Sequence, residues 1–240
     1  MENIISVSHL SFGYDSKRKV LENINFQIKK GESVGLVGAN GVGKSTLLRI
    51  LVGLNSGFQG KVTVNNIPME KKNLKTIRKN VGYVFQDADS QLFMSTVFDD
   101  VAFAPRNYGM SEAEVNEKTM EALKVVHIEQ LKDKQIYKLS GGEKKLASIA
   151  TILSTEPDVI LMDEPSVALD PKNRRNLINI LNRLNQAKII ASHDLNMIMD
   201  TCERTILLSD GKIIKDGNTK EILLDKELME ESGLELPLGY

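Results

Sequence analysis

The sequence GANGVGKS at residues 38–45 fits the pattern G-x-x-x-x-G-K-[ST], and the rest of the chain is organised around it. Its residues are Gly38, Ala39, Asn40, Gly41, Val42, Gly43, Lys44 and Ser45. The apolar run at 33–37 predicts a short buried strand before it, and the apolar spacing between 47 and 54 predicts a helix after it. A strand, a glycine loop and a helix in this order form the context in which this motif binds phosphate.

The chemistry of the loop predicts binding of a nucleoside triphosphate. Glycines let backbone N–H groups turn inward around phosphate oxygens, and the start of the following helix adds partial positive charge. We expect Lys44 to reach the β- and γ-phosphates and the Ser45 hydroxyl to ligate Mg²⁺. The alternative, a glycine-rich turn with a solvated lysine, is disfavoured by the flanking strand and helix.

The composition is that of an ordinary globular α/β protein. Of the 240 residues, 41% are hydrophobic and 26% are charged, and the net charge of −1 gives no positive field for nucleic acid or an anionic bilayer. No apolar run is long enough to span a membrane, and the acidic start of the chain lacks a signal-peptide core. A single cysteine, Cys202, excludes an intramolecular disulfide. We therefore expect a cytoplasmic protein that does not bind nucleic acid.

Two adjacent acids, Asp163 and Glu164, follow a second buried strand at 158–162. Acids at the tip of a buried strand are costly unless they bind metal or activate water. Asp163 fits the carboxylate that orients Mg²⁺ in P-loop enzymes, and Glu164 is placed to polarise water. The alternative is a solvated acidic turn.

Two further polar residues follow expected strands. Gln86 ends the strand at 81–85, and His193 ends the strand at 188–192. In open α/β sheets, ligand-binding groups lie just beyond the carboxyl ends of strands. The other two histidines, His9 and His127, are interpreted as structural or solvated.

Tyr14 lies between two expected strands, 4–10 and 20–28. Its spacing alone favours a half-exposed tyrosine in a turn. The alternative is a ring that stacks on adenine, which contributes about 1–3 kcal/mol per base.

The segment from 87 to 157 has a mostly helical pattern. Within it, Ser140 and Glu143 have the spacing of a helix capping box. The cap leaves Gly141 and Gly142 in the first turn, where each glycine costs about 1 kcal/mol relative to alanine. Bare N–H groups at a helix start also form an anion site. On local grounds a simple cap and an anion site are both possible readings.

Together these residues resemble the nucleotide-binding domain of an ABC (ATP-binding cassette) ATPase over nearly the whole chain. The features that carry the resemblance are, in chain order, the Walker A loop at 38–45, the Q-loop residue Gln86, the signature at 139–143, the Walker B strand at 159–163, the base Glu164, the D-loop at 166–170 and the switch histidine His193. The resemblance also assigns Tyr14 to the adenine-stacking position. Glu143 departs from the family's signature glutamine, but the phosphate-facing groups would be Ser140 and the backbone of the two glycines.

The resemblance implies an α/β fold: a P-loop NTPase core on a parallel sheet, an N-terminal antiparallel β subdomain and an inserted α-helical subdomain. Residues 1–240 would form one ABC ATPase domain, with 1–86 and 157–240 as the nucleotide-binding core and 87–156 as the helical signature subdomain.

The resemblance further implies ATP and Mg²⁺ as cofactors. The implied catalytic residues are Glu164, His193, Gln86 and Lys44. The implied nucleotide contacts are Tyr14, Gly38, Ala39, Asn40, Gly41, Val42, Gly43, Lys44, Ser45, Thr46, Ser140, Gly141 and Gly142, and the implied metal contacts are Ser45, Gln86 and Asp163. Two subunits, a homodimer or a heterodimer of paralogues, would pack head to tail so that the signature of one completes the ATP site of the other.

A narrower resemblance covers 85–93, 96–103 and Pro105, which look like the energy-coupling-factor (ECF) and cobalt/nickel uptake ATPases. Residues 87–90 and 98–99 depart from that group's usual run, and the chain is too short for the full C-terminal extension that many of its members carry. Membership implies an integral membrane transport component, a substrate-capture membrane subunit and a peripheral position on the cytoplasmic face of the cell membrane. The alternatives are the ATPase of a conventional ABC transporter and a non-transport ABC ATPase.

The last expectation concerns apolar residues beyond the Q-loop. We expect Leu92 and Phe93 to be exposed on a loop as a partner surface, and Val97 and Phe103 to lie in the helical core. The tail at 232–240 is expected to be loose.

Overall fold

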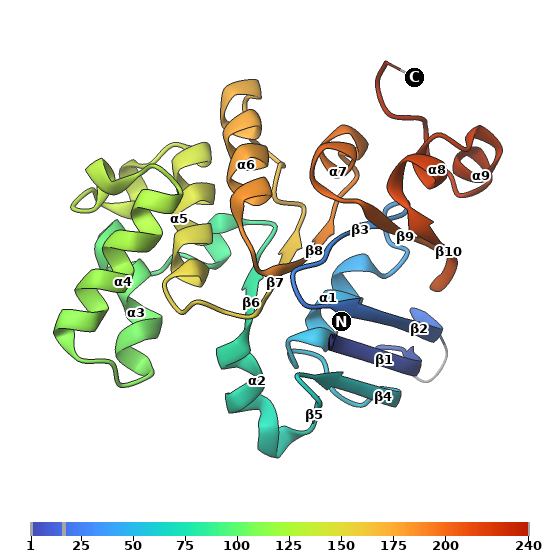
Figure 1. The fold of residues 1–240 in the computed structure, drawn as a ribbon, viewed down its shortest axis with the longest axis horizontal. Helices are drawn as coiled ribbons and strands as arrows, with labels where there is room; N and C mark the ends of the chain where they lie inside the picture. The colour runs from blue at the N-terminus through green and yellow to red at the C-terminus, as the bar shows by residue number, and fades with distance from the viewer. Residues whose placement is uncertain (1, 16–17, 240) are drawn as a thin grey trace.

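The computed structural model describes residues 2–15 and 18–239, which form two β-sheets with helices around them (Figure 1). The strands are β1 (Asn3–Phe12), β2 (Leu21–Lys29), β3 (Ser33–Val37), β4 (Gln59–Val64), β5 (Ile67–Pro68), β6 (Val81–Val84), β7 (Val159–Asp163), β8 (Ala187–Ala191), β9 (Arg204–Ser209) and β10 (Lys212–Asn218). The α-helices are α1 (Lys44–Leu51), α2 (Leu74–Asn80), α3 (Val97–Asn107), α4 (Glu112–Val125), α5 (Gly141–Leu153), α6 (Pro171–Arg183), α7 (Leu195–Thr201), α8 (Thr219–Leu223) and α9 (Lys226–Glu231). Short 3₁₀ helices are η1 (Lys71–Asn73), η2 (Ala88–Ser90), η3 (Glu129–Leu131) and η4 (Ile136–Lys138).

The larger sheet has the order β10-β9-β3-β8-β7-β6. Strands β9, β3, β8, β7 and β6 run parallel, so their carboxyl ends meet at one edge. Strand β10 pairs antiparallel with β9 through a tight turn in which Asp210 and Gly211 have φ of 47° and 72°. Positive φ at both positions suits the twist of a hairpin, and an Asp-Gly pair adopts it readily.

Alternate residues of the central strands face two different hydrophobic cores. In β7, Val159 and Leu161 pack with α1 and the smaller sheet, which is antiparallel with the order β2-β1-β4-β5. Ile160 and Met162 pack with residues of α5, α6 and α7. Figure 1 shows α6 and α7 above the larger sheet, and α1 with β1, β2 and β4 below it. This burial on both faces explains the unbroken apolar run of the strand.

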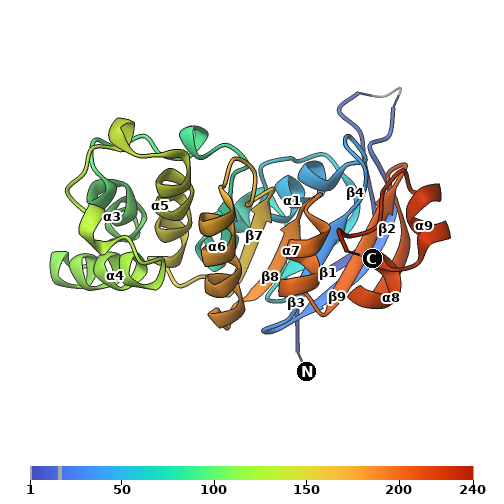
Figure 2. The ribbon, with the colours of Figure 1, turned by 90° about the horizontal axis from the view of Figure 1, so that it is seen from above.

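Helices α3, α4 and α5 lie together at one end of the molecule in both views (Figures 1 and 2). Their buried residues share one continuous core with those of the larger sheet. The predicted combination of a parallel sheet, an antiparallel sheet and a helical part is thus confirmed. The division at 86/87 and 156/157 stays a prediction, because the shared core marks no boundary there. No helix among the described residues has both the length and the apolar character to cross a lipid bilayer.

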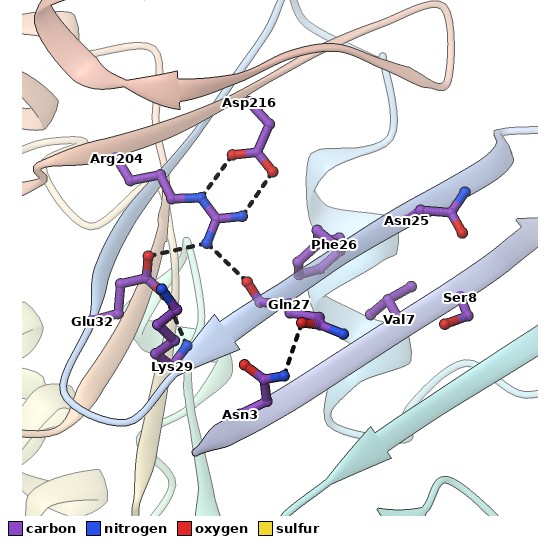
Figure 3. Close-up of a pocket in the computed structure, with 10 residues that line it drawn as sticks. All are labelled: Asn3, Val7, Ser8, Asn25, Phe26, Gln27, Lys29, Glu32, Arg204 and Asp216. Carbon is purple, nitrogen blue, oxygen red and sulfur yellow. Dashed lines mark hydrogen bonds and ion pairs between the residues drawn. The ribbon is translucent and has the colours of Figure 1, made fainter. Parts of the chain in front are cut away.

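The two sheets are joined by Arg204 at the start of β9 (Figure 3). Its guanidinium donates to both carboxylate oxygens of Asp216 at 2.7 Å, to Glu32 at 3.0 Å and to the Gln27 carbonyl on β2 at 2.8 Å. These groups line a cavity of about 590 Å³ at the amino ends of β3 and β9. Its charged groups largely pair with one another, and it lies at the opposite edge of the sheet from the loops that follow the strands.

The C-terminal segment is docked, so the expectation of a loose tail is wrong for 232–239; Tyr240 lies outside the described residues. Leu234 and Leu236 pack against the core that contains α7. Asn196 on α7 donates to the Leu238 carbonyl at 3.1 Å and accepts from the Leu238 N–H at 2.9 Å. The paired backbone groups and the two leucines account for the ordered path.

Candidate functional site

The polar residues singled out in the sequence gather at the carboxyl edge of the larger sheet. The glycine loop follows β3, His193 follows β8, Asp163 ends β7 with Glu164 after it, and Gln86 follows β6. These four strands are consecutive neighbours in the order β3-β8-β7-β6. Residues as far apart as 38 and 193 therefore line one edge, as parallel strands require.

The glycine loop is built around the buried Lys44. A Cβ atom on Gly38 would overlap the Leu208 carbonyl, so the loop passes too close to β9 for any other residue. The Lys44 ammonium donates to the carbonyls of Gly38 at 2.6 Å and Ala39 at 3.2 Å. Burial lowers the pKa of Lys44, against the opposing effect of Glu164 and Asp163. The loop thus holds a cation against a glycine-rich backbone, the combination that binds phosphate in this motif.

Asp163 and Ser45 are in direct contact. The Ser45 hydroxyl donates to one carboxylate oxygen of buried Asp163 at 2.9 Å, and the Tyr83 hydroxyl donates to the other at 3.0 Å. Burial first, and then the charge of Asp163, raise the pKa of Tyr83 well above its usual value, so this hydroxyl remains a donor. A hydroxyl and an oriented carboxylate oxygen side by side are hard ligands of the kind that Mg²⁺ prefers.

Glu164 is held in an unusual backbone conformation, with φ of 47°. One of its carboxylate oxygens lies 2.8 Å from the Nδ1 of His193 and accepts from the Ser192 hydroxyl and the His193 N–H, both at 3.2 Å. Its own N–H donates to the Ala191 carbonyl at 2.8 Å. Positive φ in a non-glycine residue costs of order 1–3 kcal/mol and clusters at functional sites. The orientation of Glu164 is therefore set by residues at the end of β8 as well as by its own strand, β7.

The loop after His193 is fixed by a bidentate ion pair. Arg174 on α6 donates to both carboxylate oxygens of Asp194, at 2.5 and 2.7 Å. Asp194 also caps α7 by accepting from the Met197 N–H at 3.0 Å. The His193 side chain, by contrast, is exposed, so it can meet a ligand at the edge of the sheet.

Gln86 is exposed, and the backbone on either side of it is tied to α5. The ammonium of Lys145, a residue only 3% exposed, donates to the carbonyls of Phe85 at 2.9 Å and Gln86 at 2.7 Å. Burial lowers the pKa of Lys145 to about 8, although the charges of Asp87 and Asp163 oppose the shift. The structure brings Gln86 to the correct edge and does not test its predicted metal contact.

The depressed pKa of Lys145 predicts a pH dependence of stability. Between about pH 8 and the unfolded value near pH 10.4, the unfolded chain holds more protons on this side chain than the folded chain. Stability contributed by Lys145 therefore rises with pH across that window. Urea unfolding of wild type and Lys145→Met at pH 7 and pH 9.5 should show the difference in unfolding free energy shifting by about 2 kcal/mol in favour of wild type. A pH-independent difference would contradict this assignment.

Tyr14 is 62% exposed, and its hydroxyl is anchored to the segment that follows the glycine loop. It lies 3.1 Å from the Thr46 hydroxyl on α1 and accepts from the Asn55 amide at 3.2 Å. The ring also meets Phe12 edge to face, with centroids 5.1 Å apart. An exposed ring fixed beside the glycine loop is compatible with both readings of Tyr14, so its nucleotide contact stays a prediction.

The capping box at the start of α5 is present as predicted. Ser140 accepts from the Glu143 N–H at 3.3 Å, and the Glu143 carboxylate accepts from the Ser140 N–H at 2.7 Å. A Cβ on Gly142 would come within 2.6 Å of the Asn173 amide on α6, so close packing adds a second reason for one of the glycines. Figures 1 and 2 both place α5 and α1 on either side of β7. Within residues 2–15 and 18–239, no hydrogen bond joins Ser140 to Lys44.

Sequence reasoning missed residues that orient the site: Tyr83, Ser192, Arg174 and Lys145. A tyrosine hydroxyl in the buried run of β6 was the available signal for Tyr83, and the position directly before His193 was the signal for Ser192. Arg174 and Lys145 lie on helices, and their targets are set by packing between distant segments.

Comparison with known proteins places this chain in a family. The family model described as "ABC transporter" matches residues 21–167, more than half of the chain. An ABC transporter ATP-binding protein of Geobacter sulfurreducens, itself named only provisionally, is 46% identical over 99% of this chain and 95% of its own length. The energy-coupling factor transporter ATP-binding protein EcfA of Methanocaldococcus jannaschii is 41% identical over 98% of this chain and 86% of its own length. EcfA of Carboxydothermus hydrogenoformans is 39% identical over 99% of this chain and 89% of its own length.

Solved structures agree with these relatives. The cbiO1 protein of Clostridium perfringens, described as part of the ABC transporter complex cbiONQ, superposes with a TM-score of 0.86 at 35% identity, covering 96% of this chain and 94% of its own. The cassette MJ0796, a dimer in a post-hydrolysis state with ADP and Pi, gives a TM-score of 0.81 at 28% identity. The match covers 90% of this chain and 98% of MJ0796. The expected ABC ATPase fold is thereby confirmed. With its glycine loop, paired acids and strand-end histidine at one edge, the chain belongs to the ABC transporter ATP-binding proteins and is an ATPase of that family.

Proposed function

We propose that this chain is the ATP-hydrolysing subunit of an ECF-type importer that takes up a micronutrient, either a vitamin or a transition-metal ion such as cobalt or nickel. The observation that carries the proposal is the 39% and 41% sequence identity to two EcfA proteins over nearly the whole chain, together with the structural similarity to cbiO1. The run at 91–93 beyond the Q-loop points the same way.

The residues at the sheet edge support hydrolysis of Mg·ATP. Lys44 and the backbone donors of 38–45, with Thr46, would bind the phosphates. Ser45 and Asp163 would hold Mg²⁺, with Gln86 as a third contact, and the ion would neutralise developing phosphate charge. Glu164 would align or deprotonate the attacking water, and His193 would contact the γ-phosphate.

The separation of α5 from α1 supports a two-chain site. Because α5 and α1 lie on either side of β7 and no hydrogen bond joins Ser140 to Lys44 in the described chain, the donors at the start of α5 would serve ATP bound to a second subunit. That subunit would be a second copy or a paralogue packed head to tail. ATP binding would close the pair, and hydrolysis would open it.

The surface beyond the Q-loop differs in part from the sequence expectation. Leu92 is only 6% exposed and belongs to the core, whereas Phe103, expected in the core, is 42% exposed. Phe93 is 65% exposed as expected, and its ring meets Phe103 edge to face with centroids 4.8 Å apart. Val97 is buried as expected. Phe93 and Phe103 form an exposed aromatic pair, which suits contact with the integral membrane component.

Replacing the aromatic pair should block transport while leaving ATP binding intact. Phe93→Ser with Phe103→Ser should leave ATP binding by the isolated subunit within about twofold of wild type, because both rings are exposed. The same protein should lose binding to the membrane component and suppress uptake in vesicles. Val125→Ser, an exposed apolar residue at the end of α4, is the matched control. Normal uptake by the double variant would place the coupling surface elsewhere.

Isolation of the complex from native membranes tests the function proposed. The chain should be a peripheral protein on the cytoplasmic face that copurifies with a transport component and a small substrate-capture membrane subunit. A partner typical of a conventional ABC exporter or binding-protein-dependent importer would favour that alternative. Copurification with nucleic acid or ribosomes would favour a non-transport ABC ATPase.

A further inference from the structure

The first turn of α5 carries a negative charge, Glu143, at the end that would face a triphosphate. Its carboxylate caps the helix by accepting from the Ser140 N–H at 2.7 Å. In the described chain, the N–H groups of Gly141 and Gly142 have no recorded acceptor and remain for a ligand. A carboxylate beside these donors opposes an anion, because the positive potential of a helix start is what attracts phosphate.

Lys134 cancels this charge at close range. Its ammonium lies 3.1 and 3.0 Å from the two carboxylate oxygens of Glu143, and both side chains are partly buried. Partial burial weakens solvent screening of the pair. The bond to Lys134 and the bond from the Ser140 N–H both lower the pKa of Glu143, with the Ser140 bond the larger cause. The carboxylate is thus ionised, and its charge is matched by one cation.

The position of Lys134 is fixed by its backbone. The Lys134 carbonyl accepts from the Val97 N–H at 3.1 Å, and its N–H donates to the Leu131 carbonyl at 2.8 Å. Gln135 forms a bridge with Thr96, so the lysine is carried on backbone paired with the start of α3. This is a preformed partner and not a mobile surface lysine.

The neighbouring charges are engaged elsewhere. Lys144 forms an ion pair with Asp89 at 2.5 Å, and the Lys138 ammonium lies over the ring of Tyr137, 5.6 Å from its centroid. Among the described residues, Lys134 is the cation recorded within ion-pair distance of Glu143. Removing it leaves the carboxylate uncompensated.

We propose that Lys134 is a positioning residue that neutralises Glu143, so that the start of α5 can receive the γ-phosphate of ATP bound to the second subunit. This inference rests on the two-chain site of the proposed function. Lys134 does not touch the nucleotide. It neutralises and orients Glu143, which lies beside the Gly141 and Gly142 N–H groups that would contact the phosphate.

A double-mutant cycle tests the proposal. Lys134→Met should weaken ATP-dependent dimerisation and lower kcat by about five- to tenfold, since like charges placed together oppose association. ATP affinity of the isolated subunit should be unchanged, because the side-chain and backbone bonds of Lys134 in the described chain go to Glu143, Val97 and Leu131 and not to the glycine loop. In a Glu143→Gln background the same Lys134→Met change should alter both quantities by less than about twofold. Lys134→Arg should retain the wild-type behaviour.

The outcomes separate a charge effect from a packing effect. An equal loss in both backgrounds would mean that Lys134 merely supports the loop, and no loss in either would remove its role; both results overturn the proposal. Ser140→Arg provides the reference. If Ser140→Arg blocks dimerisation while Lys134→Met does not, only this inference fails. If Ser140→Arg is also harmless, the two-chain site itself fails.

Discussion

Glu164→Gln is expected to lower ATP turnover by about 10²–10⁴-fold while leaving Mg·ATP binding intact. The glutamine is isosteric, so it can keep contacts to the Ser192–His193 loop, but it cannot take a proton from water. Because binding persists without hydrolysis, the ATP-bound pair of subunits should accumulate. Steady-state phosphate release and size-exclusion chromatography with Mg·ATP measure the two effects.

The control for this variant is Glu156→Gln, which removes the same charge from an exposed glutamate that precedes β7 and pairs with Lys118. It should retain turnover, because exposed ion pairs contribute about 1 kcal/mol or less to stability. Near wild-type turnover by Glu164→Gln would remove Glu164 from the role of base.

Ser140→Arg should abolish hydrolysis while ATP binding by the isolated subunit stays nearly intact. The arginine side chain would occupy the exposed start of α5, and α5 lies on the other side of β7 from α1, the helix that follows the glycine loop. Lys44→Ala should act differently and weaken ATP binding by about 10–100-fold, since a charge-assisted phosphate contact contributes about 1.5–3 kcal/mol. Titration with a fluorescent ATP analogue distinguishes the two variants.

Loss of ATP binding in isolated Ser140→Arg would contradict this division of roles. Wild-type affinity in Lys44→Ala would equally contradict the placement of phosphate on the 38–45 loop. Ser140→Arg should lower the free energy of unfolding by about 0.5–2 kcal/mol, because it removes the side-chain acceptor that caps α5. Lys44→Ala should also be less stable than wild type, because the Gly38 and Ala39 carbonyls lose their donor. Both variants should still unfold cooperatively, which separates loss of function from loss of the fold.

The strands could be predicted from local apolar patterns, and the site could be predicted because parallel strands bring their carboxyl ends to one edge. Apolar runs at 34–37 and 159–162 mark strands buried on both faces, and both strands are present. Once the strands are parallel, polar residues at their carboxyl ends must share an edge. For that reason Lys44, Asp163, Glu164 and His193 meet as expected, although Gly38 and His193 are far apart in sequence.

The direction of side chains beyond Gln86 could not be predicted, because tertiary contacts decide it. The Gln91 side chain accepts from the Phe85 N–H at 3.1 Å and donates to the Ser148 carbonyl at 2.7 Å. Those bonds fix the loop so that Leu92 turns into the core and Phe93 turns out. Phe103 then packs on Phe93 at the surface, a pairing that helical spacing alone does not indicate.

Contacts of charged side chains with distant segments could not be predicted either, because tertiary packing decides which groups meet. Arg174 meets Asp194 because α6 lies beside the start of α7, and Lys145 meets the carbonyls of 85–86 because α5 packs against the end of β6. The tail at 232–239 also depends on α7, which supplies Asn196 to hold Leu238. Sequence spacing carries no signal for such contacts.

Mixing Lys44→Ala with Ser140→Arg tests the two-chain ATP site most directly. Each protein alone should be inactive, but a heterodimer contains one site with an intact glycine loop and an intact α5 start. The two proteins should therefore associate with each other in an ATP-dependent manner, measured by energy transfer between labelled subunits. If the sites act independently, hydrolysis should return to at most about a quarter of the wild-type rate per chain, by the statistics of random pairing. Absence of both ATP-dependent heterodimers and recovered hydrolysis would contradict an ATP site shared between two chains.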